Sequence, residues 1–208
     1  MQNPLEINGL TKFYNKKVAV KNISFKLKKN EIVGILGPNG CGKTTTIGMI
    51  LGLLKPSSGQ ILINGMEIES KRVEMLSNLN FISPYIELPK KLTVKQNLEI
   101  YGRLYDVKNL NTKIEYLSEK LRLNEIINSI TGELSSGQKN RVSLAKSIIN
   151  DPIILLLDEP TASLDPETGD FIRSFLEEYQ NEKETSILLA SHNMNEVERL
   201  CSSVLMMK

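Results

Sequence analysis

The chain has 208 residues, 40% of them hydrophobic, so it can bury a substantial core as one domain or as one domain with a subdomain. Lysine and arginine total 26 against 24 aspartates and glutamates, a net charge of +2. This balance provides no broad basic face of the kind that nucleic-acid-binding proteins use. No apolar run reaches the roughly 18 residues of a membrane-spanning helix. With two cysteines, Cys41 and Cys201, and no secretory pattern, we expect a reducing cytoplasmic compartment and a membrane role only through a partner.

The first third of the chain predicts strands of two kinds. Apolar and polar residues alternate in the opening stretches, which is typical of antiparallel strands with one buried face. A compact apolar run then leads into a glycine-rich turn and an apolar-patterned stretch, the order expected for a strand, a phosphate-type loop and a helix. The predicted elements are antiparallel strands at 5–10 and 18–27 with a turn at 15–17, a strand at 32–36, a helix at 44–54 and a strand at 60–64.

The rest of the chain alternates helical and strand patterns. Helical spacing with polar exteriors makes the middle third mostly helical. The unbroken apolarity of residues 153–157 suits a parallel strand that is buried on both faces. The predicted elements are helices at 93–104, 112–123 and 136–150, a strand at 153–157, a helix at 167–180, a strand at 186–190, a short helix at 194–200 and a last strand at 204–207.

The glycine-rich turn carries the most specific chemical pattern. Residues 37–44 read Gly-Pro-Asn-Gly-Cys-Gly-Lys-Thr, which fits a phosphate-binding loop between a strand and a helix. Such a loop turns backbone N–H groups toward anionic oxygens, and the helix start adds the positive end of its dipole. We predict that Lys43 reaches the β- and γ-phosphates and that the Thr44 hydroxyl ligates Mg²⁺. The alternative is an ordinary glycine turn with a solvated lysine, and the flanking strand and helix argue against it.

Polar residues also stand where two predicted strands end, and ligands gather at such ends in open α/β sheets. We predict that Asp158 holds Mg²⁺ through its water shell and that Glu159 polarises the attacking water as a general base. Alternatively, this pair marks a solvated strand end or a helix cap. His192 is the only histidine in the chain and is placed to reach a γ-phosphate, although a lone histidine is more often a packed or surface residue.

The segment Leu134-Ser135-Ser136-Gly137-Gln138 precedes Asp158-Glu159 and completes a family pattern. With it, the chain resembles the nucleotide-binding domains of ABC transporters over nearly its whole length. The resemblance implies an α/β fold: a P-loop NTPase-type mixed-sheet core with an N-terminal antiparallel β subdomain and an α-helical subdomain. It implies a single ABC ATPase domain over residues 1–208, with the ATP-binding core and β subdomain at 1–80 and 151–208 and the helical subdomain at about 86–150.

Carried over residue by residue, the resemblance also implies the site. The catalytic residues are Glu159 as the carboxylate, His192 as the switch histidine and Lys43. The Mg²⁺ ligands are Thr44 and Asp158. Ser135, Ser136 and Gly137 would cap the γ-phosphate held by an opposite subunit, whereas the same serine-rich string taken alone is a helix N-cap. The implied ATP-binding residues are Tyr14 as the aromatic that stacks on adenine, Asn39, Gly40, Cys41, Gly42, Lys43, Thr44 and Thr45 of the Walker A loop, Ser135, Ser136, Gly137 and Gln138 of the signature, and Asp165 of the D-loop.

The chain departs from the family pattern at three places. Ser136 stands where the family usually has the first of two glycines, which adds a side chain near the approaching phosphate. Residues 81–85 read Phe-Ile-Ser-Pro-Tyr where the family normally has a glutamine that ligates Mg²⁺ and links the ATP site to the membrane partner. A serine hydroxyl, water or a different loop geometry are the possible substitutes. Relatives usually continue beyond Lys208 with another strand and a helix, so we expect a truncated domain.

The resemblance implies an ATP-binding and ATP-hydrolysing subunit that powers transport. Its cofactors are ATP and Mg²⁺, and its partners are a transmembrane permease subunit and a second ABC ATPase subunit, with no nucleic acid. It is expected to be cytoplasmic and peripheral on the inner face of the cell membrane. Residues 92–105 look like those of export-type ATPases for drugs, polysaccharides or sodium. The alternatives are a repair or translation ATPase, whose coiled-coil insertion or tandem domain is absent here, and an inactive regulatory module, which would lack Glu159 or His192.

Overall fold

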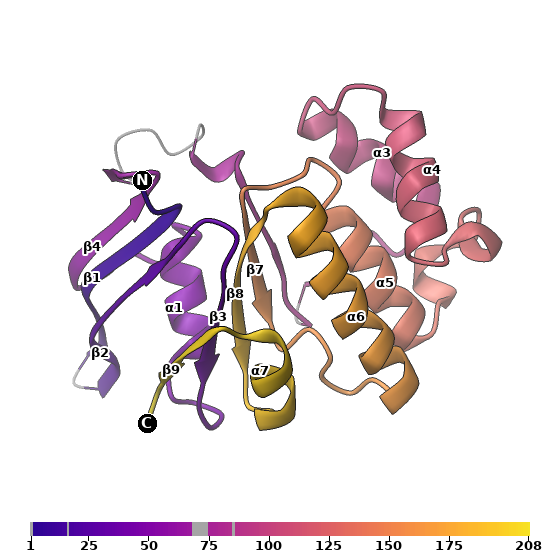
Figure 1. The fold of residues 1–208 in the computed structure, drawn as a ribbon. Helices are drawn as coiled ribbons and strands as arrows, with labels where there is room; N and C mark the ends of the chain where they lie inside the picture. The colour runs from indigo at the N-terminus through magenta and orange to yellow at the C-terminus, as the bar shows by residue number, and fades with distance from the viewer. Residues whose placement is uncertain (1, 16, 68–74, 85) are drawn as a thin grey trace.

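The computed structural model describes residues 2–15, 17–67, 75–84 and 86–208. Lys16 of the predicted turn and Tyr85 of the segment without the glutamine lie outside the described residues. Figure 1 shows two sheets, with helix α1 between them and further helices beyond the second sheet. The chain therefore combines an antiparallel β part, a parallel sheet and a helical part, which confirms the predicted α/β fold.

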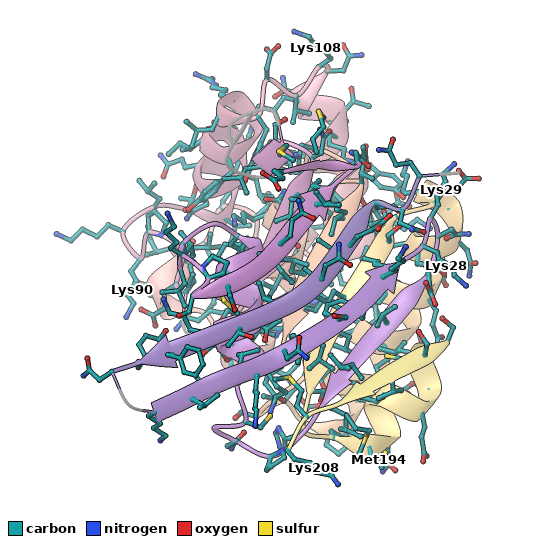
Figure 2. All side chains as sticks on the ribbon, turned by 90° about the vertical axis from the view of Figure 1, so that its left-hand side faces the viewer. Lys28, Lys29, Lys90, Lys108, Met194 and Lys208 are labelled. Atoms are coloured by element: carbon teal, nitrogen blue, oxygen red, sulfur yellow. The ribbon has the colours of Figure 1, made fainter. Side chains whose placement is uncertain are left out.

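The first sheet is antiparallel and has the strand order β2-β1-β4-β5. Its strands are β1 (Leu5–Tyr14), β2 (Lys17–Leu27), β4 (Ser58–Ile63) and the short β5 (Met66–Glu67). The predicted hairpin is confirmed, because Leu5 pairs with Leu27 and Tyr14 with Lys17. Alternation places Leu5 and Ile7 in the core, and an irregularity in the register between Ile7 and Leu10 brings Leu10 to the same side. Figure 2 looks onto this sheet, whose strands β1 and β2 run across the face of the molecule.

The second sheet is parallel and has the order β6-β7-β8-β3-β9. Its strands are β3 (Ile32–Leu36), β6 (Leu79–Ile82), β7 (Ile154–Asp158), β8 (Ser186–Ser191) and β9 (Ser203–Met206). Every residue of β3, β7 and β8 is buried, as expected of strands covered on both faces. In Figure 1 these strands point toward the lower edge of the molecule, so the loops at their carboxyl ends meet there.

The helices lie on both faces of the parallel sheet. They are α1 (Lys43–Ile50), α3 (Val94–Leu104), α4 (Leu110–Lys120), α5 (Ser136–Ser147), α6 (Pro166–Lys183) and α7 (Met194–Leu200), with 3₁₀ turns at Asn124–Ile126 and Thr131–Glu133. In Figure 1, α1 fills the space toward the antiparallel sheet, while α5 and α6 cover the opposite face and α3 and α4 lie beyond them. None of the described helices combines the length and apolarity that a bilayer crossing requires.

Alternate residues of β7 feed two separate cores. Leu155 and Leu157 pack with the buried residues of α5 and α6, whereas Ile154 and Leu156 pack with α1 and the antiparallel sheet. Because successive side chains of a strand point to opposite faces, one apolar run supplies both layers. The parallel sheet is thus fixed from both sides, and the loops at its carboxyl edge start from rigid positions.

Helix α1 ends before the predicted boundary. The apolar pattern predicts a helix through Leu54, but α1 ends at Ile50. Gly52 adopts the left-handed conformation with φ 65°, and the N–H groups of Leu53 and Leu54 both turn back to the carbonyl of Gly48. This glycine-based C-terminal cap stops the helix although the following side chains are apolar.

Candidate active site

The loop between β3 and α1 has a backbone that only glycine allows at several points. Gly40 and Gly42 have φ values of 85° and 105°, in the left-handed region that disfavours side chains. A Cβ on Gly37 would lie 2.5 Å from the carbonyl oxygen of Met207, whereas one on Gly40 would meet nothing within 4 Å. The loop is therefore pressed against the end of β9 on one side and open on the other. Asn39, Gly40 and Thr44 are exposed, and Cys41, Gly42 and Thr45 are half-buried.

Lys43 is buried inside this loop, with only 5% of its surface exposed. Its Nζ donates hydrogen bonds to the carbonyl oxygens of Gly37 at 2.7 Å and Pro38 at 3.3 Å. The same Nζ lies 3.5 Å from Oε1 of Glu159, forming an ion pair. The ammonium group is thus held against the first residues of the loop. An anion bound by the backbone N–H groups of the loop would contact it there.

Thr44 and Asp158 form the second contact of the site. The Thr44 hydroxyl donates a hydrogen bond of 2.9 Å to Oδ2 of Asp158, which is 1% exposed. The other carboxylate oxygen, Oδ1, is buried and has no hydrogen-bond partner among the described residues. Burial raises the pKa of Asp158, the hydrogen bond from Thr44 opposes that rise, and the charge of Glu159 adds to it. A hydroxyl and an unsatisfied carboxylate oxygen are the donor types that a hard divalent cation takes.

Glu159 and His192 come together from neighbouring strand ends. Glu159 has φ 53°, its N–H donates to the carbonyl of Ala190 at 2.8 Å, and its Oε2 lies 2.7 Å from Nδ1 of His192. The Glu159 side chain is 13% exposed, whereas that of His192 is 54% exposed. The buried carboxylate therefore contacts the imidazole on one side and the ammonium of Lys43 on the other, and the ring is open toward solvent.

The residues of the predicted signature lie apart from this group, at the start of α5. Ser135 caps the helix: its Oγ accepts from the N–H of Gln138 at 3.3 Å, and its own N–H donates to the Gln138 side chain at 2.9 Å. This is a capping box, so the N-cap interpretation holds for the hydroxyl within one chain. In the part of the chain that the structure describes, no hydrogen bond joins Ser135, Ser136, Gly137 or Gln138 to the phosphate loop.

Asp165 and Tyr14 have simple local roles in the single chain. Asp165 caps α6 by accepting the N–H of Thr168 at 2.9 Å, and hydrogen bonds from Thr168 lower the pKa of its carboxyl group. A Cβ on Gly137 would lie 3.3 Å from the Thr168 side chain, so the starts of α5 and α6 pack together. Tyr14 ends β1 with 46% of its surface exposed, and Nζ of Lys12 lies 5.2 Å from its ring centre. Tyr14 is thus accessible to solvent at the end of β1, with the ammonium of Lys12 over its ring.

A cleft of about 320 Å³ lies between the core and the helical part. Its lining includes Ser83, Pro84, Ser136, Glu159 and Ser163. The segment in which the glutamine is replaced therefore shares a cleft with Glu159 and with the signature serine.

Three residues near the site have polar contacts that the sequence did not indicate. Asn140 of α5 donates to the carbonyl of Pro160 at 2.7 Å, which links the signature helix to the loop after Glu159. Thr161 in that loop contacts Glu196 of α7. No pattern in a single sequence could have identified these contacts, because each joins residues that are far apart along the chain.

A strand, a glycine-rich loop and a helix that present a buried lysine beside a carboxylate pair define a nucleotide-binding site of the P-loop ATPase class. Comparison with known proteins identifies the family. The family model described as ABC transporter matches residues 20–162. The ABC transporter ATP-binding protein NatA of Bacillus subtilis is 38% identical over 191 residues, which cover 90% of this chain and 77% of that protein.

Further relatives agree with this assignment. The Nod factor export ATP-binding protein I of Rhizobium johnstonii is 38% identical over 199 residues, and the match covers 95% of this chain and 64% of that protein. The bacterial ABC transporter cassette MJ0796, solved as a dimer, aligns with TM-score 0.88 and 25% identity over 98% of this chain and 94% of its own. The chain belongs to the ABC transporter family as an ATP-binding subunit. Members of this family bind ATP and hydrolyse it, so the chain is an ATPase.

Proposed function

We propose that this ATPase powers the movement of a substrate, in the export direction, through a separate transmembrane permease subunit. The observation that carries the proposal is the convergence of Lys43, Thr44, Asp158, Glu159 and His192 at the carboxyl edge of the parallel sheet. Phosphoryl transfer is catalysed mainly by positioning and electrostatic stabilisation. This group supplies a cation, two carboxylates and an imidazole at fixed positions.

The residues present fit a Mg²⁺ ion bound with the nucleotide. Asp158 has a buried oxygen without a partner, and Thr44 is exposed beside it. Among the described residues, no group of three histidine, cysteine or acidic side chains could hold a metal alone. The ion would therefore complete its shell with phosphate oxygens and water, as Mg²⁺ usually does. When bound, it would offset the charge of the β- and γ-phosphates.

Lys43, Glu159 and His192 each have a different role in the proposed reaction. In this proposal Lys43 exchanges its loop carbonyls for phosphate oxygens and stabilises the charge of the transferring group. Glu159 orients the attacking water through its carboxylate and acts as general base. His192 is held by Glu159 through Nδ1, and its exposed Nε2 would contact the γ-phosphate, donating a hydrogen bond when the ring carries both protons.

The signature residues act in this proposal on the ATP of a second ATPase subunit. Ser135 caps α5, so Ser136 and Gly137 are the first residues of the helix, where backbone N–H groups lack partners within the helix and favour an anion. The related cassette MJ0796 is a dimer and has also been solved with ADP and phosphate bound. We infer that two copies enclose two Mg-ATP molecules, with Tyr14 stacking on adenine and Asp165, Gln138 and the loop residues Asn39 to Thr45 completing the contacts.

The arrangement of parts and the location follow from the same proposal. Residues 1–80 and 151–208 form the ATP-binding core with the β subdomain, and residues 86–150 form the helical subdomain. The subunit sits on the cytoplasmic face of the membrane through its permease partner. Export is supported by the relative that is named for Nod factor export and by the resemblance of residues 92–105 to export-type ATPases.

Replacement of Glu159 tests the proposal. Glu159→Gln keeps the shape of the side chain but removes the base, so ATP turnover is expected to fall about 10² to 10⁴-fold. The variant still binds Mg-ATP and accumulates as an ATP-bound dimer, measured by light scattering after gel filtration. The control is Glu115→Gln, an exposed residue of α4, which keeps wild-type turnover. Normal turnover in Glu159→Gln removes Glu159 from this role.

A further inference from the structure

A buried carboxylate lies behind the catalytic pair. Glu196 is in α7 and is only 2% exposed. Its Oε1 accepts a hydrogen bond of 2.7 Å from the Thr161 hydroxyl, and its Oε2 accepts one of 2.7 Å from the Ser191 hydroxyl. Both carboxylate oxygens are therefore engaged, one by Thr161 of the loop after Glu159 and the other by Ser191 at the end of β8. This Thr161–Glu196–Ser191 bridge contacts neither the phosphate loop nor Glu159 directly among the described side chains.

The two hydroxyls flank the catalytic residues in sequence. Thr161 follows Glu159 by two positions, and Ser191 immediately precedes His192. Ser191 Oγ also accepts a hydrogen bond from the N–H of Asn193 at 3.0 Å. The Ser191 hydroxyl therefore has partners both in α7 and in the residue that follows His192. On the other loop, the N–H of Ala162 donates to the carbonyl of Glu159 at 3.1 Å. The bridge thus joins the backbone that carries the carboxylate to the backbone that carries the imidazole.

The helix that supplies Glu196 is itself held in place. Asn193 caps its start by accepting the N–H of Asn195 at 3.0 Å. Near its end, Arg199 donates to Glu177 of α6 at 2.9 Å and also pairs with Asp170. In Figure 2, Met194 at the start of α7 lies with Lys208 at one end of the molecule, opposite Lys108. The carboxylate of Glu196 therefore projects from a fixed element toward the carboxyl edge of the sheet.

Burial of the Glu196 carboxylate in this bridge lowers the stability of the folded chain. Neither oxygen of Glu196 pairs with a cation in the part of the chain that the structure describes. Burial of a charge without a counter-ion destabilises the folded state through the loss of hydration. Burial first and the charge of Glu196 second raise the pKa of the Cys201 thiol to about 12. Two charge-assisted hydrogen bonds offset the cost only while both hydroxyls stay in position.

We propose that Glu196 is a positioning residue for ATP hydrolysis. By holding Thr161 and Ser191 at once, it fixes the two loops so that Glu159 Oε2 and His192 Nδ1 remain within the observed 2.7 Å. Small displacements of catalytic groups reduce rate strongly because reaction requires alignment. The inference rests on the proposed function and adds to it a residue that acts through the pair without touching the nucleotide.

The test removes each hydroxyl without changing the shape of the side chain much. Thr161→Val and Ser191→Ala are each expected to lower kcat about tenfold while the KM for ATP changes less than about twofold, because ground-state contacts to the nucleotide are kept. Glu196→Gln is expected to retain more activity than Glu196→Ala, since an amide can still accept from one hydroxyl and donate to the other. Thr112→Val, an exposed change in α4, is the matched control and keeps wild-type kinetics.

A double-mutant cycle separates positioning from general destabilisation. In a His192→Ala background, Thr161→Val is expected to cost less than about twofold in kcat, because the loop no longer has an imidazole to align. An undiminished tenfold loss in that background overturns the inference, as does a KM that rises in step with the fall of kcat. Thermal unfolding of each variant, measured alongside, shows that the compared proteins are folded.

The outcomes also separate this inference from the proposed function. If the wild-type chain hydrolyses ATP and Glu159→Gln does not, the proposed chemistry holds. Wild-type kcat in Thr161→Val and Ser191→Ala then overturns the positioning role of Glu196 alone. If Glu159→Gln turns over normally, the proposed chemistry fails, whatever the bridge variants do.

Discussion

Asp158→Asn is expected to stabilise the protein in the absence of nucleotide while removing its response to Mg²⁺. Asp158, Glu159 and Lys43 bring two negative charges and one positive charge into a buried site. Oδ1 of Asp158 has no partner there. The asparagine side chain keeps the hydrogen bond from Thr44 and lets Lys43 pair with Glu159 alone. The buried site then becomes neutral.

The pKa of Asp158 gives the sign of the effect. Burial raises the pKa in the folded state, so the unfolded chain releases its proton at lower pH than the folded chain. The free energy of unfolding therefore falls as the pH rises above about 4, the ordinary value of an aspartate. The penalty is complete once the pH lies above the raised pKa of the folded state. Asp158→Asn removes one buried charge, which stabilises the folded state, and leaves an amide without a partner, which destabilises it. The net increase in the free energy of unfolding is about 1 kcal/mol.

Thermal unfolding measures this prediction. For a chain of this size, a gain of about 1 kcal/mol raises the Tm by about 2 to 4 °C. The comparison is made at neutral pH with a chelator and without nucleotide, and then with ATP in the absence and presence of Mg²⁺. Addition of Mg²⁺ should raise the Tm of the ATP-bound wild type but not that of Asp158→Asn, whose loop and Lys43 still bind ATP. Asp106→Asn, an exposed change, should stay near the wild type. A Tm of Asp158→Asn at or below that of the wild type without nucleotide would show that the Asp158 charge does not destabilise the folded protein.

Three further changes test the loop, the stacking residue and the signature. Gly37→Ala places a Cβ 2.5 Å from the carbonyl of Met207, so the Tm and ATP affinity should both fall in calorimetry; an unchanged Tm contradicts the close packing. Tyr14→Ala should weaken ATP binding about tenfold through lost stacking, whereas Tyr14→Phe binds normally; equal binding by both removes the stacking role. Ser136→Gly should strengthen ATP-dependent dimerisation in sedimentation, and weaker dimerisation would show that the serine contributes to closure.

The sequence predicted the bounds of one fully buried strand and one short amphipathic helix correctly. Strand β3 at 32–36 and helix α7 at 194–200 have the predicted bounds. Helix ends were predicted less well, because they depend on backbone capping. Gly52 ends α1 before the predicted boundary. Helix α5 ends at Ser147 although the apolar pattern continues to residue 150. Apolar periodicity reports which face is buried and does not report where the backbone turns.

For the site, the sequence predicted which residue types would matter and which strand ends carry them. The structure adds the contacts between Thr44 and Asp158 and between Glu159 and His192. The Glu196 bridge was not predictable, because Thr161 and Glu196 are 35 positions apart and neither belongs to a pattern that names it. The phosphate-binding role proposed for Ser136 needs a second subunit, so a single chain does not display it.

Equilibrium binding of ATP by the Lys43→Ala variant measures whether this lysine holds the nucleotide. We propose that loop N–H groups and this buried ammonium hold the terminal phosphates, and loss of a charge-assisted contact worth about 2 to 3 kcal/mol weakens binding roughly 30- to 150-fold. Titration calorimetry with Mg²⁺ present should show this loss in Lys43→Ala and none in Lys28→Ala, an exposed lysine (Figure 2). Equal ATP affinity in the wild type and Lys43→Ala would contradict the account.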